Sequence, residues 1–174
     1  ATEMEGHPDN VAAALYGGAV LAWAGDDFAD AIKLEVSPRI TAVAFIPSNN
    51  VPTSKARKML PETIPHKDAV KNSINAALLT QALTIRPDLL LAATEDYVHQ
   101  SYREGAMPKS YSLMQKLRAA GVAAFISGAG PTVLALLVDA DLNHELGDLV
   151  RAAGSGFEVE NLDISSVGYQ VSNI

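Results

Sequence analysis

The 174-residue sequence contains no cysteine. It therefore has no disulfide framework, no thiolate nucleophile and no cysteine-based zinc site, which fits a reducing compartment such as the cytoplasm. Basic residues are few: 13 lysines and arginines stand against 20 aspartates and glutamates, a formal net charge of −7. This balance argues against nucleic acid or an anionic membrane surface as the main partner. No apolar run approaches the roughly 20 residues that a membrane span needs, so we predict a cytoplasmic protein.

Several catalytic motifs are also missing. The four histidines, at positions 7, 66, 99 and 144, include no pair with the i, i+4 spacing of a helical metal site, so metal-dependent hydrolysis is not indicated. There is no Gly-x-Ser-x-Gly elbow of a serine hydrolase, and no Walker-type Gly-Lys-Ser/Thr follows a glycine loop. Hydrophobic residues make up 48% and charged residues 19% of the chain, which indicates one folded globular domain.

What the sequence does contain is centred on a glycine loop. The segment Ser127-Gly128-Ala129-Gly130-Pro131-Thr132 lies between two apolar runs, 121–126 and 133–138, which predict a pair of buried strands. Glycines at alternate positions let backbone N–H groups approach a ligand, because no Cβ intervenes. The loop suits an anion or a polar small molecule. A hairpin that turns with small residues and binds nothing is an equally open interpretation.

The remaining pattern predicts helices interspersed with strands. Helices are expected over 11–16, 55–60, 68–83, 88–98, 110–120 and 142–153, and further strands over 19–24, 32–36, 41–46, 157–162 and 167–171. Short turns join the first three strands, which predicts an antiparallel meander. The apolar face of the helix over 68–83 is expected at Val70, Ile74, Ala77, Leu78 and Leu83. We therefore predict an α+β fold with helices packed mainly on one face of a sheet.

Polar residues in the predicted loops and helix ends are candidate binding groups. His7 and Asn10 precede the first helix, Thr53 and Arg57 share a helix face, and Arg103 follows a polar stretch. If they converge on the glycine loop, the two arginines could grip a carboxylate or phosphate while amide and imidazole groups orient a hydroxyl or amine. Each also has an ordinary interpretation, because an arginine near a helix end is often a solvated charge and Asn10 can simply cap a helix.

Four segments, in order along the chain, resemble motifs of one kinase family. Residues 5–12, Glu-Gly-His-Pro-Asp-Asn-Val-Ala, resemble the signature of the homoserine kinases, which belong to the GHMP small-molecule kinases. Residues 53–61 are similar to that family's Ser-Thr-x-x-Ala-Arg-x-x-Leu-Pro segment, although Pro52 stands where the family has serine. His99-Gln100-Ser101-Tyr102-Arg103 resembles its His-Gln-Pro-Tyr-Arg stretch, and residues 127–131 resemble its third glycine motif.

The resemblance implies a fold and a missing partner domain. It implies that residues 1–174 form one GHMP-kinase C-terminal, substrate-side domain with a ferredoxin-like antiparallel sheet. The family's ATP-binding loop, Pro-x-x-x-Gly-Leu-Gly-Ser-Ser-Ala, does not occur in this sequence. We therefore expect that a separate N-terminal half binds most of ATP and Mg²⁺, and that residues 1–24 form the junction with it. We also expect the chain alone to be inactive in phosphotransfer.

The resemblance also implies a reaction. The family transfers the γ-phosphoryl group of MgATP to the side-chain hydroxyl of L-homoserine, giving O-phospho-L-homoserine for threonine biosynthesis. By this analogy His7 and Asn10 would hold homoserine and its reacting hydroxyl. Arg57, with Thr53 beside it, would stabilise charge near the γ-phosphate, so that Asn10 and Arg57 are the expected catalytic residues.

The same analogy assigns the other site residues. Arg103 would pair with the substrate carboxylate, and Gly128, Ala129 and Gly130 would shape the pocket wall through backbone groups. The family often forms homodimers, so a second copy of the protein is an expected partner. Two alternatives stay open: another GHMP kinase acting on a different small alcohol, and a non-catalytic α+β module that binds a small molecule for regulation.

Overall fold

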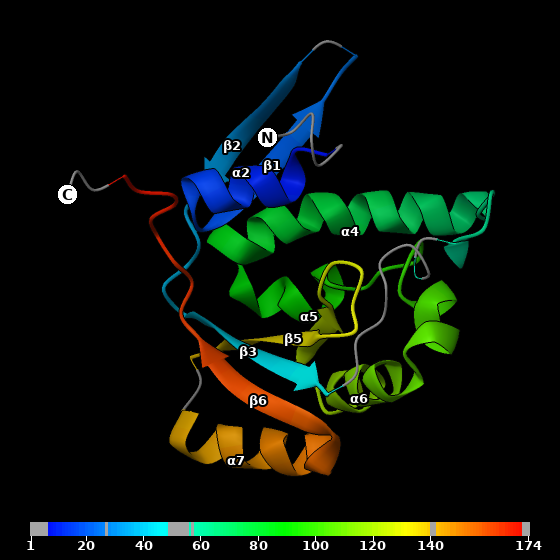
Figure 1. Cartoon of the computed structure of the whole chain (residues 1–174), viewed down its shortest axis with the longest axis vertical. Helices are drawn as coiled ribbons and strands as arrows, with labels where there is room; N and C mark the ends of the chain where they lie inside the picture. The colour runs from blue at the N-terminus through cyan, green and yellow to red at the C-terminus, as the bar shows by residue number, and fades with distance from the viewer. Residues whose placement is uncertain (1–6, 27, 49–55, 57, 140–141, 172–174) are drawn as a thin grey trace.

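The computed structural model describes residues 7–26, 28–48, 56, 58–139 and 142–171. This part of the chain contains a four-stranded sheet with helices on both sides and a separate two-stranded ribbon (Figure 1). Of the predicted helix over 55–60, Ala56 and Lys58 are helical and Met59 and Leu60 are not, while residues 55 and 57 lie outside the described residues.

The main sheet has ferredoxin-like topology. Its elements follow one another as β3 (Ile40–Pro47), α6 (Pro108–Ala119), β4 (Ala123–Ile126), β5 (Val133–Val138), α7 (Leu142–Ala153), a short 3₁₀ turn η3 (Gly154–Gly156) and β6 (Phe157–Leu162). The strand order is β4-β5-β3-β6, and all neighbouring strands are antiparallel. This β-α-β-β-α-β arrangement confirms the predicted α+β class and the ferredoxin-like sheet.

Helices cover both faces of this sheet, which corrects the expectation that they pack mainly on one. Val43 and Phe45 of β3 are buried against α6 and α7. Ile40 and Ala42, on the opposite face of the same strand, are buried with α4 (His66–Thr84) and α5 (Leu90–Ala93). Figure 1 shows these two helix pairs on opposite sides of the sheet. The reason lies in β3 itself, because its near-continuous apolar sequence needs cover on both faces.

The first two strands form a sheet of their own. After α2 (Asp9–Tyr16), β1 (Ala19–Ala24) pairs with β2 (Ala29–Leu34) in an antiparallel ribbon. The predicted three-stranded meander is therefore wrong, since β3 lies between β5 and β6 and does not pair with β2. Its partners differ in character, since β5 is apolar and largely buried whereas β6 alternates apolar residues with glutamates. The sequence of a single strand therefore does not reveal which partners it will find.

The chain ends in a tail, residues 163–171, that runs across α2. The predicted strand over 167–171 is wrong, because no ladder forms there. Isolated backbone bonds hold the tail instead: the Gly18 N–H donates to the Ser165 carbonyl (2.5 Å) and the Tyr169 N–H donates to the Ala14 carbonyl (3.0 Å). The Lys33 ammonium adds bonds to the carbonyls of Tyr16 (2.8 Å) and Ser166 (2.5 Å).

Two predicted helices differ in detail. In α4 the residues packed on the sheet are Leu78, Leu79, Ala82 and Leu83. Val70, Ile74 and Ala77 are exposed, so the predicted apolar face is wrong for these three residues and right for Leu78 and Leu83. The predicted helix over 88–98 is shorter, consisting of the 3₁₀ turn η1 (Pro87–Leu89) and α5, which ends at Ala93.

A side chain explains why that helix stops. The Asp96 carboxylate accepts hydrogen bonds from the backbone N–H groups of Val98, His99 and Gln100, and so replaces the helical carbonyls as their acceptor. Aspartate commonly competes with helix formation in this way. The segment that follows folds as the 3₁₀ helix η2 (Ser101–Ala106).

Candidate functional site

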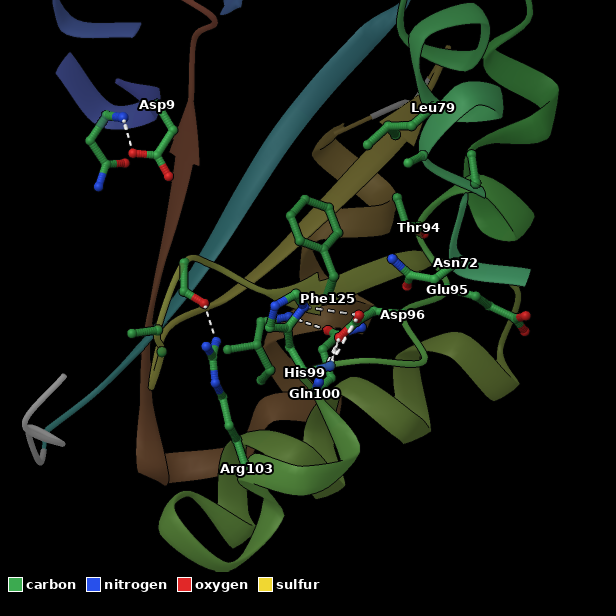
Figure 2. A pocket seen from close by; sticks show the side chains of 17 residues that line it. Asp9, Asn72, Leu79, Thr94, Glu95, Asp96, His99, Gln100, Arg103 and Phe125 are labelled. Carbon is green, nitrogen blue, oxygen red and sulfur yellow. Dashed lines mark hydrogen bonds and ion pairs between the residues drawn. The ribbon is translucent and has the colours of Figure 1, made fainter. Parts of the chain in front are cut away.

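A cavity of about 610 Å³ lies where the glycine loop faces α4 and η2 (Figure 2). Its wall comes from five places: the start of α2, the middle of α4, the segment from α5 to η2, the end of β4, and the glycine loop. The lining residues are Asp9, Asn10, Asn72, Ala76, Leu79, Ala93, Thr94, Glu95, Asp96, His99, Gln100, Arg103, Phe125, Ile126, Gly128, Ala129 and Gly130. Segments far apart in the sequence thus meet in one space.

The glycine loop is a tight turn that needs its glycines. The Ser127 N–H donates to the Thr132 carbonyl and the Gly130 N–H to the Ser127 carbonyl, both at 2.9 Å. Gly128 and Gly130 have φ angles of 56° and 80°, a region that side chains disfavour. A Cβ on Gly130 would also lie 2.5 Å from the Met107 sulfur, whereas the space beside Gly128 is open. The predicted strand–loop–strand arrangement is confirmed.

Arg103 joins η2 to this loop. Its side chain reaches towards the glycine turn in Figure 2, where Nη1 donates to the Gly128 carbonyl at 2.9 Å. The residue is only 8% exposed, and its buried Nε has no hydrogen-bond partner among the described residues. A buried donor of a charged group is costly to leave unpaired. An anionic ligand group in the cavity would supply the missing acceptor.

Asp96 fixes the segment that carries Arg103. Besides three backbone N–H groups, its carboxylate lies 3.2 Å from Nδ1 of His99. Two asparagines of α4 hold the residues that flank Asp96: the Asn72 side chain accepts a bond from the Tyr97 N–H (3.1 Å), and Asn75 donates to the Glu95 carbonyl (3.0 Å). Helix α4 therefore holds one end of the segment, while Asp96 organises the turn that leads into η2.

Arg118 of α6 ties α5 to β4 beside the cavity. Its Nη1 donates to Thr94 Oγ1 (2.9 Å) and to the Ala124 carbonyl (3.0 Å), and its Nη2 donates to the Leu91 carbonyl (2.6 Å). Burial lowers the pKa of this guanidinium, and the nearby Glu95 carboxylate acts in the opposite direction. Because Nη1 and Nη2 are occupied by groups of the protein, Arg118 stabilises the structure of the wall.

The structure brings several of the predicted site residues together. Asn10, Arg103 and the loop residues Gly128, Ala129 and Gly130 all line the cavity. His7 lies just before α2 and is not part of the lining. Thr53 and Arg57 lie outside the described residues. Asn10 and Arg103 thus share one cavity with the glycine loop, as the sequence predicts. The roles assigned to all of these residues stay predictions.

Several lining residues were not predicted from the sequence. Asn72 lies in α4, Phe125 lies in β4 and Thr94 follows α5. None of them carries a local signal, since only the packing of α4 and α5 on the sheet brings them to the cavity. Asp96 does have a local signal, because aspartate side chains often accept hydrogen bonds from the backbone N–H groups two to four residues later and so form turns. Gln100 belongs to the motif over residues 99–103, but the motif by itself assigns it no role.

The described residues contain neither a candidate metal site nor a helix that could span a membrane. No group of three or more histidine, aspartate or glutamate side chains there could hold a metal ion. In the same part of the chain, every helix is too short or too polar to cross a bilayer.

Comparison with known proteins defines the class. Residues 74–156 match the family described as GHMP kinases C terminal. The chain carries a GHMP kinase C-terminal domain, in agreement with its ferredoxin-like sheet and with the motif resemblance.

Its relatives are more specific. A homoserine kinase of Streptomyces avermitilis is 50% identical over 171 residues, which are 98% of this chain and 55% of that protein. A homoserine kinase of Rhodococcus erythropolis is 47% identical, again over 98% of this chain and 55% of the relative. The crystal structure of homoserine kinase from Cytophaga hutchinsonii is 27% identical with a TM-score of 0.79, covering 92% of this chain and 53% of that one. The chain thus spans about half the length of these relatives.

Proposed function

We propose that this chain forms the C-terminal part of a homoserine kinase, which phosphorylates the side-chain hydroxyl of L-homoserine with MgATP. The observation that carries the proposal is the buried Arg103, whose Nη1 is bound to Gly128 and whose Nε has no described partner. Placed in a cavity, this guanidinium suits the carboxylate of an amino acid. The names of the relatives supply the particular amino acid.

The charges around the cavity support a zwitterionic substrate. Arg103 provides a cation at one wall, while Asp9, Glu95 and Asp96 provide carboxylates at others. An amino acid needs one group of each sign, whereas a simple phosphate or carboxylate would need only the cation. Asn10, at the mouth of α2, adds an amide that can hydrogen-bond a hydroxyl group.

Phosphoryl transfer depends mainly on positioning and charge stabilisation. In the proposed enzyme Arg103 anchors the substrate carboxylate and Asn10 holds its reacting hydroxyl, so that the hydroxyl points to the γ-phosphate. His7 would assist Asn10, and Arg57 with Thr53 would neutralise charge on the phosphate. ATP and Mg²⁺ would be bound mainly by an N-terminal half.

The organisation of the complete protein is part of the same proposal. Residues 1–24 would form the junction with the ATP-binding half. The exposure of Leu15, Tyr16, Leu21 and Trp23, all within this range, supports a surface that another part of the kinase covers. The chain alone would not transfer phosphate. A cytoplasmic location and a homodimer stay predictions.

The test is to titrate the chain and the complete kinase with L-homoserine in a calorimeter, and to assay both for ATP-dependent formation of O-phospho-L-homoserine. We expect binding and turnover by the complete kinase and no turnover by the chain alone. Binding by the complete kinase but not by the chain would mean that both halves build the pocket. No binding and no turnover by the complete kinase would refute the assignment to homoserine. Turnover by the chain would refute the division into two necessary halves.

A further inference from the structure

The outer edge of β4 is closed by two side chains. In the four-stranded sheet β4 pairs with β5 alone, so the backbone groups of Ala124 and Ile126 on its other side need partners. Arg118 donates to the Ala124 carbonyl (3.0 Å), and the Ile126 N–H donates to Oε1 of Gln100 (2.6 Å). Gln100 thus takes the place of a neighbouring strand at the residue immediately before the glycine loop.

Gln100 and Arg103 hold that loop from one short segment. Gln100 precedes the 3₁₀ helix η2 and Arg103 lies within it, three residues later. Side chains three residues apart lie on the same side of a 3₁₀ helix. One therefore binds the entry of the loop at Ile126, and the other binds the Gly128 carbonyl within it. Both line the cavity (Figure 2).

Little freedom remains at Gln100 itself. Its own N–H donates to the Asp96 carboxylate at 2.5 Å, so its backbone is held as well as its side chain. The residue is 8% exposed. If its acceptor oxygen were removed, the buried Ile126 N–H would lose its partner, and β4 would have to shift to regain one.

Such a shift would reach Arg103 through the loop. The position of the Gly128 carbonyl helps to set which way the guanidinium turns, since Nη1 is bound to it while the buried Nε has no partner among the described residues. Met107, which follows η2, blocks the other side of the loop at Gly130. The loop is therefore confined between η2 and the end of β4, and the bond at Ile126 sets its place.

We propose that Gln100 is a positioning residue: through Ile126 it places the glycine loop so that Arg103 presents its free donor to the substrate carboxylate. The consequence of this placement for substrate binding rests on the proposed function.

The test compares Gln100→Met with Gln115→Met in the complete kinase. Methionine is similar in length to glutamine but offers no amide oxygen, and Gln115 is exposed on α6 and serves as the matched control. We expect Gln100→Met to raise the KM for L-homoserine about tenfold, with the KM for ATP and kcat changed less than about threefold. Gln115→Met should change none of them.

Amide hydrogen exchange adds a readout that does not depend on activity. Measured well below the melting temperature, the Ile126 amide should exchange faster in Gln100→Met than in Gln115→Met. The Ala124 amide, which donates to the Val122 carbonyl (2.8 Å), should be unchanged. Gln100→Glu keeps an acceptor oxygen, so exchange at Ile126 should stay slow in this variant. This second variant keeps the proposal testable if Gln100→Met does not fold, because fast exchange in Gln100→Glu would contradict it.

The outcomes separate the two proposals. An unchanged homoserine KM in Gln100→Met, an equal rise in the KM values for both substrates, or unchanged exchange at Ile126 would overturn the role of Gln100. Fast exchange at Ile126 in Gln100→Glu would overturn it too. If the unsubstituted kinase does not act on homoserine, the proposed function fails, and the exchange rates still decide whether Gln100 positions the loop.

Discussion

Arg103 is buried and Arg118 is half-buried, and their hydrogen bonds separate a binding role from a structural one. All of the bonds described for Arg118 go to groups of the protein, whereas Nε of Arg103 has no described partner and lies at a cavity wall. A buried charge whose donors are paired stabilises the fold, while an unpaired donor favours a ligand. The two residues should therefore respond to substitution in different measurements.

Arg103→Ala should weaken binding of L-homoserine to the complete kinase about tenfold to a hundredfold. This corresponds to the roughly 1.5–3 kcal/mol that a charge-assisted contact contributes. Calorimetric titration measures the change. Arg86→Ala is the control, since Arg86 pairs with Asp88 on the surface. An Arg103→Ala kinase with unaltered homoserine affinity would contradict the assigned role.

Arg118→Ala should instead lower the free energy of unfolding of this chain, by about 1.5–3 kcal/mol, because it strips partners from Thr94 and from the carbonyls of Leu91 and Ala124. Urea denaturation followed by circular dichroism measures this. The exposed pair of Arg86 again provides the control, and Arg86→Ala should have little effect. Equal urea midpoints for the two variants would show that the bonds of Arg118 do not stabilise the fold.

At the scale of the elements, the tail and α2 touch backbone to backbone. A Cβ on Gly168 would lie 2.0 Å from the Leu15 carbonyl oxygen, and a Cβ on Gly17 would lie 2.4 Å from the Val167 carbonyl carbon. Only glycine permits such an approach. The C-terminal tail therefore reaches α2 through two glycines that face each other across the contact.

We expect Gly168→Ala to detach the tail from α2. The Tyr169 amide, bonded to the Ala14 carbonyl at 3.0 Å, should then exchange much faster with solvent. Gly156→Ala is the matched control, since a Cβ there meets nothing within 4 Å. Slow exchange at Tyr169 in Gly168→Ala would mean that the tail does not depend on this close approach.

An ion pair joins the start of β3 to the residue after β5. The side chains of Arg39 and Asp139 form two hydrogen bonds of 2.9 and 3.0 Å through Nε, and Nη2 also contacts the carboxylate. The hydrogen bond and the charge of Arg39 lower the pKa of Asp139. Because the pKa is lowered in the folded state, the pair stabilises the fold fully at pH values above the ordinary pKa of an aspartate. That contribution disappears as the pH falls through the lowered value.

Arg39→Gln should raise the pKa of Asp139 back towards its ordinary value, as measured by NMR titration of the carboxyl carbon. Asp88, whose pKa is lowered mainly by its hydrogen bond with Arg86, should keep most of its shift and so reports on the specificity of the change. An identical titration of Asp139 in both proteins would show that Arg39 does not act on it. Since both side chains are exposed and salt screens their interaction, the difference in pKa should be measured in acidic solution at low salt.

At the scale of the whole molecule, the ribbon of β1 and β2 has an exposed apolar face. Leu21 and Ile32 are directly opposite each other in the ribbon and are 48% and 54% exposed. Trp23 lies on the same face. A two-stranded ribbon has little stability of its own. If the chain is the C-terminal part of a kinase, we expect the other half to pack on this face.

Trp23 is the only tryptophan of the chain, so its fluorescence reports on this surface. Acrylamide should quench Trp23 readily in the isolated chain. The complete kinase is measured as a variant in which every tryptophan except Trp23 is replaced by phenylalanine. In this variant the quenching of Trp23 should be much weaker. The chain in urea gives the fully exposed reference. Equal quenching in the chain and in the kinase would mean that the face is not covered.

Sequence by itself determined the elements whose signals are local. The limits of β1, α7 and β6 were predicted as observed, and the glycine loop was recognised as a turn between strands, because alternation, helical spacing and positive φ act within a few residues. The motifs also predicted the kinase class and pointed to Asn10, Arg103 and the glycine loop, which line one cavity.

Only the tertiary structure decided the rest. The partners of β3, the second helix layer on its sheet and the crossing of the tail over α2 depend on contacts between residues distant in the sequence, by 88 to 120 positions for the pairs of β3 and by 155 for Ala14 and Tyr169. The same is true of function at Gln100, whose role exists only because its side chain meets Ile126. Hydrogen bonds between distant segments leave no period in a sequence, since each partner looks like an ordinary polar or apolar residue until the chain has folded.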